Sequence, residues 1–122
     1  MQSKSRFALL LALGAALLLH VSCSASEKLL PPDKANYAGQ WKAPDMDLLI
    51  TPAGNVQYKR VRNGATTTVN GPIQAFKGSD FSVGFLFLST TFVVSRAPYQ
   101  EDGKWKMVVD GVELIKSNGG QF

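Results

Sequence analysis

The stretch VQYKRVRNGATTTV, residues 56–69, decides the fold. It holds two runs rich in Val, Tyr and Thr, residues 56–62 and 65–69, with only Asn63-Gly64 between them. Residues of these types favour strands, and Asn-Gly supplies the positive φ angles that a two-residue hairpin loop needs. The stretch therefore predicts an antiparallel β-hairpin.

Hairpin signals of the same kind recur on both sides of this stretch. Turn residues such as Asn70-Gly71-Pro72, Glu101-Asp102-Gly103 and Asp110-Gly111 separate the other predicted strands, at residues 46–51, 73–76, 81–88, 91–97, 105–109 and 112–116. We find no convincing helical periodicity beyond a turn or two in any segment after the first 22 residues. About eight strands in sequence order predict an all-β antiparallel meander that closes into a small barrel, which removes exposed edges. A two-sheet sandwich is the alternative.

One predicted strand is apolar on both faces. Phe81, Val83, Phe85 and Phe87 alternate along residues 81–88, and the residues between them are also largely apolar. A strand of this kind is typical of the centre of a sheet. We therefore expect it to be buried and its Phe side chains to fill the barrel.

The first 22 residues read as a secretory signal peptide. Lys4 and Arg6 precede thirteen apolar residues, 7–19, followed by small residues. A bilayer-spanning helix needs about 20 apolar residues, whereas a shorter run suits the core of an export signal. The chain is therefore expected to be exported.

Val21-Ser22-Cys23 resembles the end of the bacterial lipobox, in which the cysteine becomes the acylated first residue. The sequence departs from the family at His20, where Leu is preferred. The resemblance implies a lipid anchor on Cys23, and the absence of Asp at Ser24 resembles the outer-membrane default, facing the periplasm. The alternative is ordinary cleavage before Ser26 or Glu27, which gives a secreted soluble protein.

The 100 residues that remain are expected to form a tether, residues 23–36, and a single β domain, residues 37–122. The formal net charge of +4 includes Lys4 and Arg6, so about +2 remains after cleavage. A charge this small gives no reason to expect nucleic-acid binding.

Residue types limit the chemistry of the chain. The only histidine is His20, and the only cysteine is Cys23. Histidine-dependent nucleophilic catalysis and the usual zinc sites are thereby excluded from the domain, which leaves only carboxylate chemistry. Since the carboxylates cluster at turns, we predict no catalytic residue, no metal and no cofactor.

The residues Gly39 and Trp41 resemble the Gly-x-Trp opening of lipocalins and lipocalin-like bacterial barrels. In that family the glycine starts the first strand and the tryptophan plugs the closed end of the barrel. The resemblance implies a carrier of a small apolar ligand as one possible function.

Lys59, Arg60 and Arg62 form the densest basic cluster, and Tyr99 lies in a polar segment after Pro98. We single out these four residues as possible contacts to a partner. The sequence thus predicts a non-catalytic binding module of the cell envelope, held at the membrane by acylated Cys23, whose partner is an envelope protein or wall component. The alternative is the lipocalin-like carrier.

Overall fold

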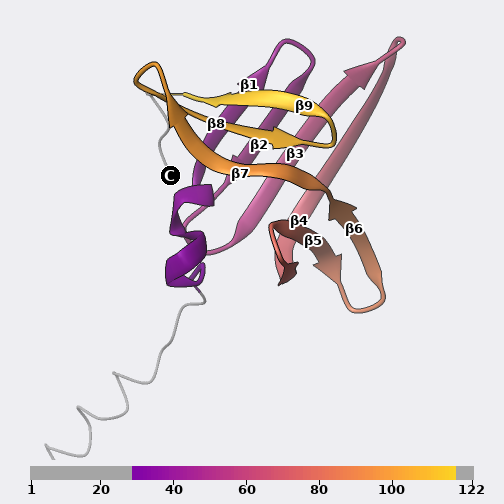
Figure 1. Cartoon of the computed structure of the whole chain (residues 1–122). Coiled ribbons are helices and arrows are strands. Elements are labelled where there is room, and N and C mark those ends of the chain that lie inside the picture. Colours follow the sequence, from indigo (N-terminus) through magenta and orange to yellow (C-terminus); the bar gives the residue numbers. More distant parts are fainter. Residues whose placement is uncertain (1–28, 118–122) are drawn as a thin grey trace, which may run out of the picture.

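The computed structural model describes residues 29–117 and consists almost entirely of strands (Figure 1). A 3-10 helix, η1 (Pro32–Tyr37), precedes nine strands: β1 (Gly39–Ala43), β2 (Met46–Ile50), β3 (Asn55–Arg62), β4 (Ala65–Lys77), β5 (Asp80–Phe85), β6 (Leu88–Phe92), β7 (Val94–Glu101), β8 (Lys104–Val109) and β9 (Val112–Lys116). The predicted all-β class is confirmed, with nine strands where about eight were expected. No helix within the described range is long and apolar enough to cross a bilayer.

The strands form one antiparallel sheet in the order β6-β5-β4-β3-β2-β1-β9-β8-β7. Strands adjacent in the chain pair with each other, except β6 and β7, and β1 also pairs with β9, with Trp41 opposite Lys116. This pairing curls the meander into a half-barrel, in place of the alternative two-sheet sandwich (Figure 1). Within residues 29–117, β6 and β7 are the two edges of the sheet, although they follow each other in the chain.

Carboxylates bind the backbone where β6 passes into β7. The N–H of Val93 donates to the Asp110 carboxylate at 2.9 Å, and the N–H of Val94 donates to the Asp80 carboxylate at 2.7 Å. The N–H of Asp110 in turn donates to the carbonyl of Val93 at 2.8 Å. Side chains thus satisfy backbone donors that have no ladder partner there.

The concave face of the half-barrel holds one apolar core. Met46, Leu48 and Ile50 alternate inward along β2. Trp41, Met107 and Leu114 are fully buried and come from β1, β8 and β9. No polar or charged residue in the described range is buried, so the core depends on apolar packing.

The predicted turn at Asn70-Gly71-Pro72 does not form, because residues 65–77 make one long strand. The first part of β4 pairs with β3 as far as Pro72, and the remainder pairs with β5 from Ile73 onward. Pro72, which lacks an N–H, is the last residue opposite β3. The turn-forming residues therefore mark the point at which the strand changes partner.

The prediction of one buried strand over residues 81–88 is wrong. Strand β5 ends at Phe85, a two-residue loop follows, and Leu88 begins β6 opposite Phe85. Phe81 and Val83 are buried as expected, but Phe85 is 65% exposed and Phe87 is 87% exposed. Two of the side chains expected to fill the barrel thus lie on its surface.

Residues 29–36 belong to the segment that we expected to act as a tether. In the structure, η1 begins at Pro32 and ends at the buried Tyr37. Leu30 packs against the core, and its N–H donates to the carbonyl of Pro52 at 3.0 Å. These residues therefore pack on one end of the half-barrel.

Candidate binding surface

The β3–β4 hairpin extends beyond the core as a basic arm, residues 59–68. Every residue from Val61 to Thr68 is exposed, as is Lys59, and Arg60 is half-buried. Figure 1 shows the loop of this hairpin projecting at the upper right. The arm is a two-stranded structure that solvent reaches on both faces.

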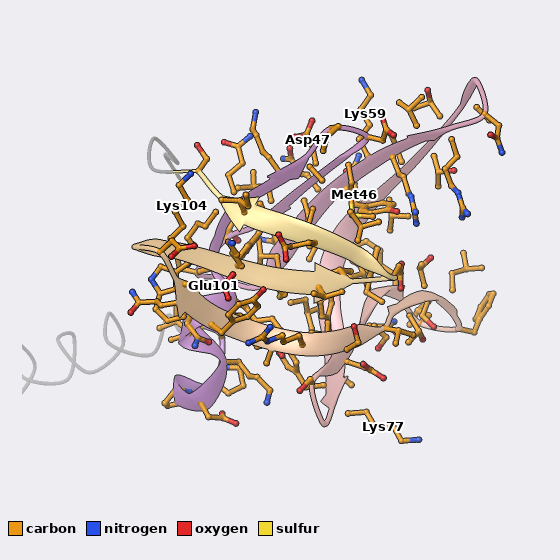
Figure 2. All side chains as sticks on the ribbon, turned by 45° about the horizontal axis from the view of Figure 1, so that its top comes forward. Met46, Asp47, Lys59, Lys77, Glu101 and Lys104 are labelled. Carbon is orange, nitrogen blue, oxygen red and sulfur yellow. The ribbon has the colours of Figure 1, made fainter. Side chains whose placement is uncertain are left out.

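The cations of the basic arm are not neutralised. None of Lys59, Arg60 and Arg62 forms an ion pair within residues 29–117. The carboxylate of Asp47, opposite Lys59 in the β2–β3 register, lies 3.9 Å from Lys42 instead. Figure 2 shows Asp47 and Lys59 on the solvent side of their strands. The structure thus brings three of the four predicted contact residues together on one exposed element.

An open cleft of about 260 Å³ lies at the base of the basic arm. Arg60, Val61 and Arg62 line one side, and Pro44, Asp45 and Val112 lie among the residues opposite. Guanidinium groups present several N–H donors in a rigid plane, which suits carboxylate or phosphate ligands. The arm therefore offers charge and donors to an acidic partner.

Tyr99, the fourth predicted contact residue, lies elsewhere. It is half-buried on β7, five strands away from β3 in the sheet order. The Arg96 guanidinium stacks 3.6 Å from the centroid of its ring, and its hydroxyl donates to Glu113 at 3.4 Å. Tyr99 thus belongs to a separate polar cluster.

The same cluster contains an ion pair between β7 and β8. Lys106 donates to the Glu101 carboxylate at 2.9 Å. This hydrogen bond lowers the pKa of Glu101 and raises the pKa of Lys106. Glu101 and Lys106 are thus engaged with each other.

Gly39 and Trp41 lie at the end of the half-barrel that η1 covers. Gly39 is buried with a φ of +145°, and a Cβ there would lie 2.8 Å from the Lys116 side chain. The indole of Trp41 is fully buried and donates to the carbonyl of Tyr37 at 2.8 Å. The Lys116 ammonium lies 4.8 Å from the Trp41 ring, and burial lowers the pKa of Lys116. These residues pack the end of the half-barrel.

Sequence reasoning missed one exposed feature, the apolar tip formed by residues 85–88 between β5 and β6. Leu86 and Phe87 are 88% and 87% exposed. An open cleft of about 430 Å³ separates Phe85 and Leu88 from Thr68 and Asn70 of β4. Gly84 was the available signal, because a glycine inside a strand often marks a close backbone approach. A Cβ on Gly84 would lie within the contact distance of the Leu88 carbonyl oxygen.

No group of three or more His, Cys, Asp or Glu residues in the described range is arranged to hold a metal ion. Cys23 lies outside that range, so its lipidation stays a prediction. Comparison of the chain with protein-family models, with curated proteins and with solved structures finds no match. The candidate surface is therefore defined by its geometry and charge.

Proposed function

We propose that this chain is an exported, lipid-anchored and non-catalytic binding module of the bacterial cell envelope. Cys23 carries the anchor, in the outer membrane facing the periplasm, and the basic arm contacts an acidic envelope protein or wall component. The observation that carries the proposal is the arm itself: Lys59, Arg60 and Arg62 project from the core without an ion pair in the described range. Unpaired cations on a projecting element favour association with an acidic partner.

The packed interior supports a surface-binding function over the carrier function. Trp41, Met107 and Leu114 are fully buried at its centre, whereas a carrier needs space for its ligand inside the barrel. Phe85 and Phe87, which were expected to lie inside the barrel, face solvent instead.

The basic arm is tested by co-sedimentation of the purified chain, carrying Cys23→Ala, with isolated cell-wall sacculi and with an envelope protein fraction. Replacement of Lys59, Arg60 and Arg62 by Gln should weaken binding about tenfold or more at low salt. The matched control replaces three other exposed cations, Lys77, Arg96 and Lys104, and should leave binding unchanged. Equal losses in both triple variants would show a nonspecific charge effect and contradict the proposed arm.

The anchor is tested separately by membrane fractionation and mass spectrometry. Cys23→Ala should move the protein from the membrane to the soluble envelope fraction, with loss of the acyl mass. Ser24→Asp should retain the acylated protein in the inner membrane, as the lipobox resemblance implies. A wild-type chain that begins at Ser26 or Glu27 without acyl mass would show that it is a secreted soluble protein.

A further inference from the structure

Exposed apolar side chains concentrate at the apolar tip. Of the seven large apolar side chains that are exposed in residues 29–117, four are the consecutive residues of the tip: Phe85, Leu86, Phe87 and Leu88. Contiguous exposed apolar surface marks an interaction site more often than scattered single residues do. The tip is the loop end of a hairpin and therefore projects from the molecule (Figure 1). A projecting apolar group needs surroundings that can enclose it.

The tip lies on the same side of the molecule as the place where the described chain begins. Gln74 of β4 connects the two: it lines an open cleft of about 260 Å³ together with Leu29 and Leu30, and its side-chain amide donates to the carbonyl of Leu86 at 3.1 Å. Leu29 is itself 64% exposed. In Figure 1 the beginning of η1 and the β5–β6 loop lie at the lower side of the molecule, whereas the loop of the basic arm lies at the top.

The proposed anchor would keep this side close to a bilayer. Six residues, from Cys23 to Lys28, precede Leu29. A segment of this length spans at most about 20 Å when fully extended. An acylated Cys23 would therefore hold Leu29 within about 20 Å of the lipids. Because the tip shares this side, the anchor brings it within reach of the bilayer surface.

The surroundings of the tip permit contact with an apolar phase. Residues 81–95 contain no charged side chain, and the open cleft of about 430 Å³ beside the tip is lined by uncharged residues. A charge there would be costly to remove from water. The loop carbonyl of Leu86 accepts its hydrogen bond from Gln74, and Phe85 pairs with Leu88 across the hairpin. Such pairing is required where acyl chains offer the backbone no hydrogen bonds.

We propose that the apolar tip inserts into the surface of the lipid bilayer that holds the anchor. Apolar groups of peripheral proteins are buried about 5–10 Å deep, at the boundary between headgroups and acyl chains. The loop extends two residues beyond the pair of Gly84 and Ser89, about 7 Å at the rise of a strand, which matches this depth. The anchor and the tip then form two contacts with the bilayer, and the basic arm points away from it.

Insertion also accounts for the placement of Leu86. Its φ of +54° is a conformation that Leu disfavours, and its side chain is 88% exposed. Strain of this kind points to a role outside the fold. A bilayer would bury the side chain that the half-barrel leaves in solvent. The inference rests on the proposed function for the anchor, and it adds to that function a fixed orientation at the membrane.

A fluorescent label on the tip tests the insertion. Residues 24–122 retain every described element and contain no cysteine, so Phe87→Cys provides a single thiol for bimane. An N-terminal hexahistidine tag holds this chain on phosphatidylcholine vesicles that contain a nickel-chelating lipid, in place of the acylated cysteine. The bulk lipid is neutral, so attraction of the basic arm to anionic lipid does not contribute.

We expect the emission of this label to shift to the blue and to be quenched by brominated acyl chains, because the tip is surrounded by them. The matched control, Thr66→Cys, places the label on an exposed residue of the basic arm, where aqueous iodide alone should quench it. Iodide quenching that is as strong at residue 87 as at residue 66 would overturn the proposal.

A second variant tests whether the apolar side chains cause the insertion. Leu86→Gly with Phe87→Ser copies the Gly78-Ser79 loop of this chain, in which the first residue also has a positive φ, so the hairpin should form. A bimane label at Ser89→Cys, directly behind the tip, follows the insertion in this variant and in the parent chain. The ratio of inserted to free tip should fall about tenfold or more in the variant.

The control for this variant is Val61→Ser with Val93→Ser, which removes two exposed apolar side chains outside the tip. It should leave the insertion unchanged, and equal losses in the two double variants would overturn the role of the tip. The tagged chain is held at the vesicle without Cys23. A missing acyl mass in the wild type would therefore refute the anchor alone, whereas a tip that stays in water would refute the insertion alone.

Discussion

Leu86 has a backbone conformation that leucine disfavours, and its large apolar side chain is exposed to solvent. It has a φ of +54°, close to the +51° of Asn63 at the same position of the β3–β4 loop. A left-handed conformation costs a residue such as Leu about 1–2 kcal/mol, and Asn adopts it more readily. The side chain gains no burial within one copy to offset this cost, because it is 88% exposed.

Exchange of the two residues measures the cost. Leu86→Asn should raise the free energy of unfolding of the monomer by about 0.5–1 kcal/mol, because the strain is relieved. Asn63→Leu should lower it by a similar amount for the converse reason. Urea denaturation at low protein concentration provides both values. A destabilising Leu86→Asn would contradict the assignment of strain to this loop.

Tyr37 gives the fold a dependence on alkaline pH. Its ring contacts Phe76 and Phe81 edge-on, and its hydroxyl donates to the Ser79 carbonyl at 2.9 Å. Burial raises the pKa of Tyr37 in the folded chain. The unfolded chain therefore loses the phenol proton first, near the ordinary tyrosine pKa of about 10.

The stability that Tyr37 contributes is fully present below that pH and is lost as pH rises through the folded-state pKa. The free energy of unfolding should therefore fall with pH above about 10, and this fall should be smaller in Tyr37→Phe. At neutral pH the same substitution should cost about 1 kcal/mol for the lost hydrogen bond. Denaturation curves over the alkaline range compare the two proteins, and parallel pH profiles would exclude the effect.

At the scale of elements, the junction of β6 and β7 depends on two carboxylates. Asp80 and Asp110 accept hydrogen bonds from Val94 and Val93, the consecutive residues at which the chain leaves one sheet edge and starts the other. Val94 is buried, so its N–H would find no water in place of Asp80. An unsatisfied buried donor costs about 1–3 kcal/mol.

Asp80→Ala should therefore lower the free energy of unfolding by about 1–3 kcal/mol. Asp80→Asn keeps an acceptor oxygen and should cost less than half as much. Asp47→Ala is the matched control, since Asp47 is exposed and its contact with Lys42 is 3.9 Å long; exposed pairs contribute about 0–1 kcal/mol. Urea denaturation of the three variants makes the comparison, and an Asp80→Ala cost equal to that of the control would show that the junction does not need the carboxylate.

The strands could be predicted from the sequence wherever the turn-forming residues do form a turn. Asn63-Gly64 and Asp110-Gly111 give hairpins at the expected places. The prediction fails at Asn70-Gly71-Pro72, where the same residue types accommodate a change of strand partner. It fails again at Leu86-Phe87, where a loop forms without turn-forming residues. In both cases the pairing of strands in the sheet determined the structure, and this pairing cannot be predicted from the local preferences of the residues.

The sequence predicts the spatial arrangement of the candidate contact residues only in part, for a related reason. A cluster in sequence such as Lys59, Arg60 and Arg62 stays together on one hairpin, so its placement follows from the hairpin itself. Tyr99 lies far along the sheet, and only the sheet order shows that it joins another cluster. The apolar tip was expected to belong to the core because apolar periodicity alone does not show whether a side chain is buried or exposed.

As a whole, residues 29–117 form a meander whose first and last strands pair with each other, while β6 and β7 remain the edges of the half-barrel. Pairing of β1 with β9 places Lys116 over the rings of Trp41 and Trp105, at 4.8 and 5.3 Å. This pairing brings apolar side chains from the first and the last described strands into one core, which η1 covers at one end. The interior of the described part is thereby filled with buried side chains, while the basic arm and the apolar tip are exposed.

A filled interior predicts that the purified protein carries no apolar ligand. Native mass spectrometry of the Cys23→Ala chain, isolated gently from the envelope, should show the mass of the polypeptide without an added ligand. Trp41, Leu48, Met107 and Leu114 have no exposed surface, and interiors packed to normal density leave few voids larger than a water molecule. A lipid-sized mass that is lost on unfolding would contradict this packing and make the lipocalin-like carrier the leading function.

Leu114→Ala, which removes a fully buried side chain, should lower the free energy of unfolding by about 2–5 kcal/mol if the core is filled. Urea denaturation measures this loss, and a loss well below this range would indicate an interior with space for a ligand.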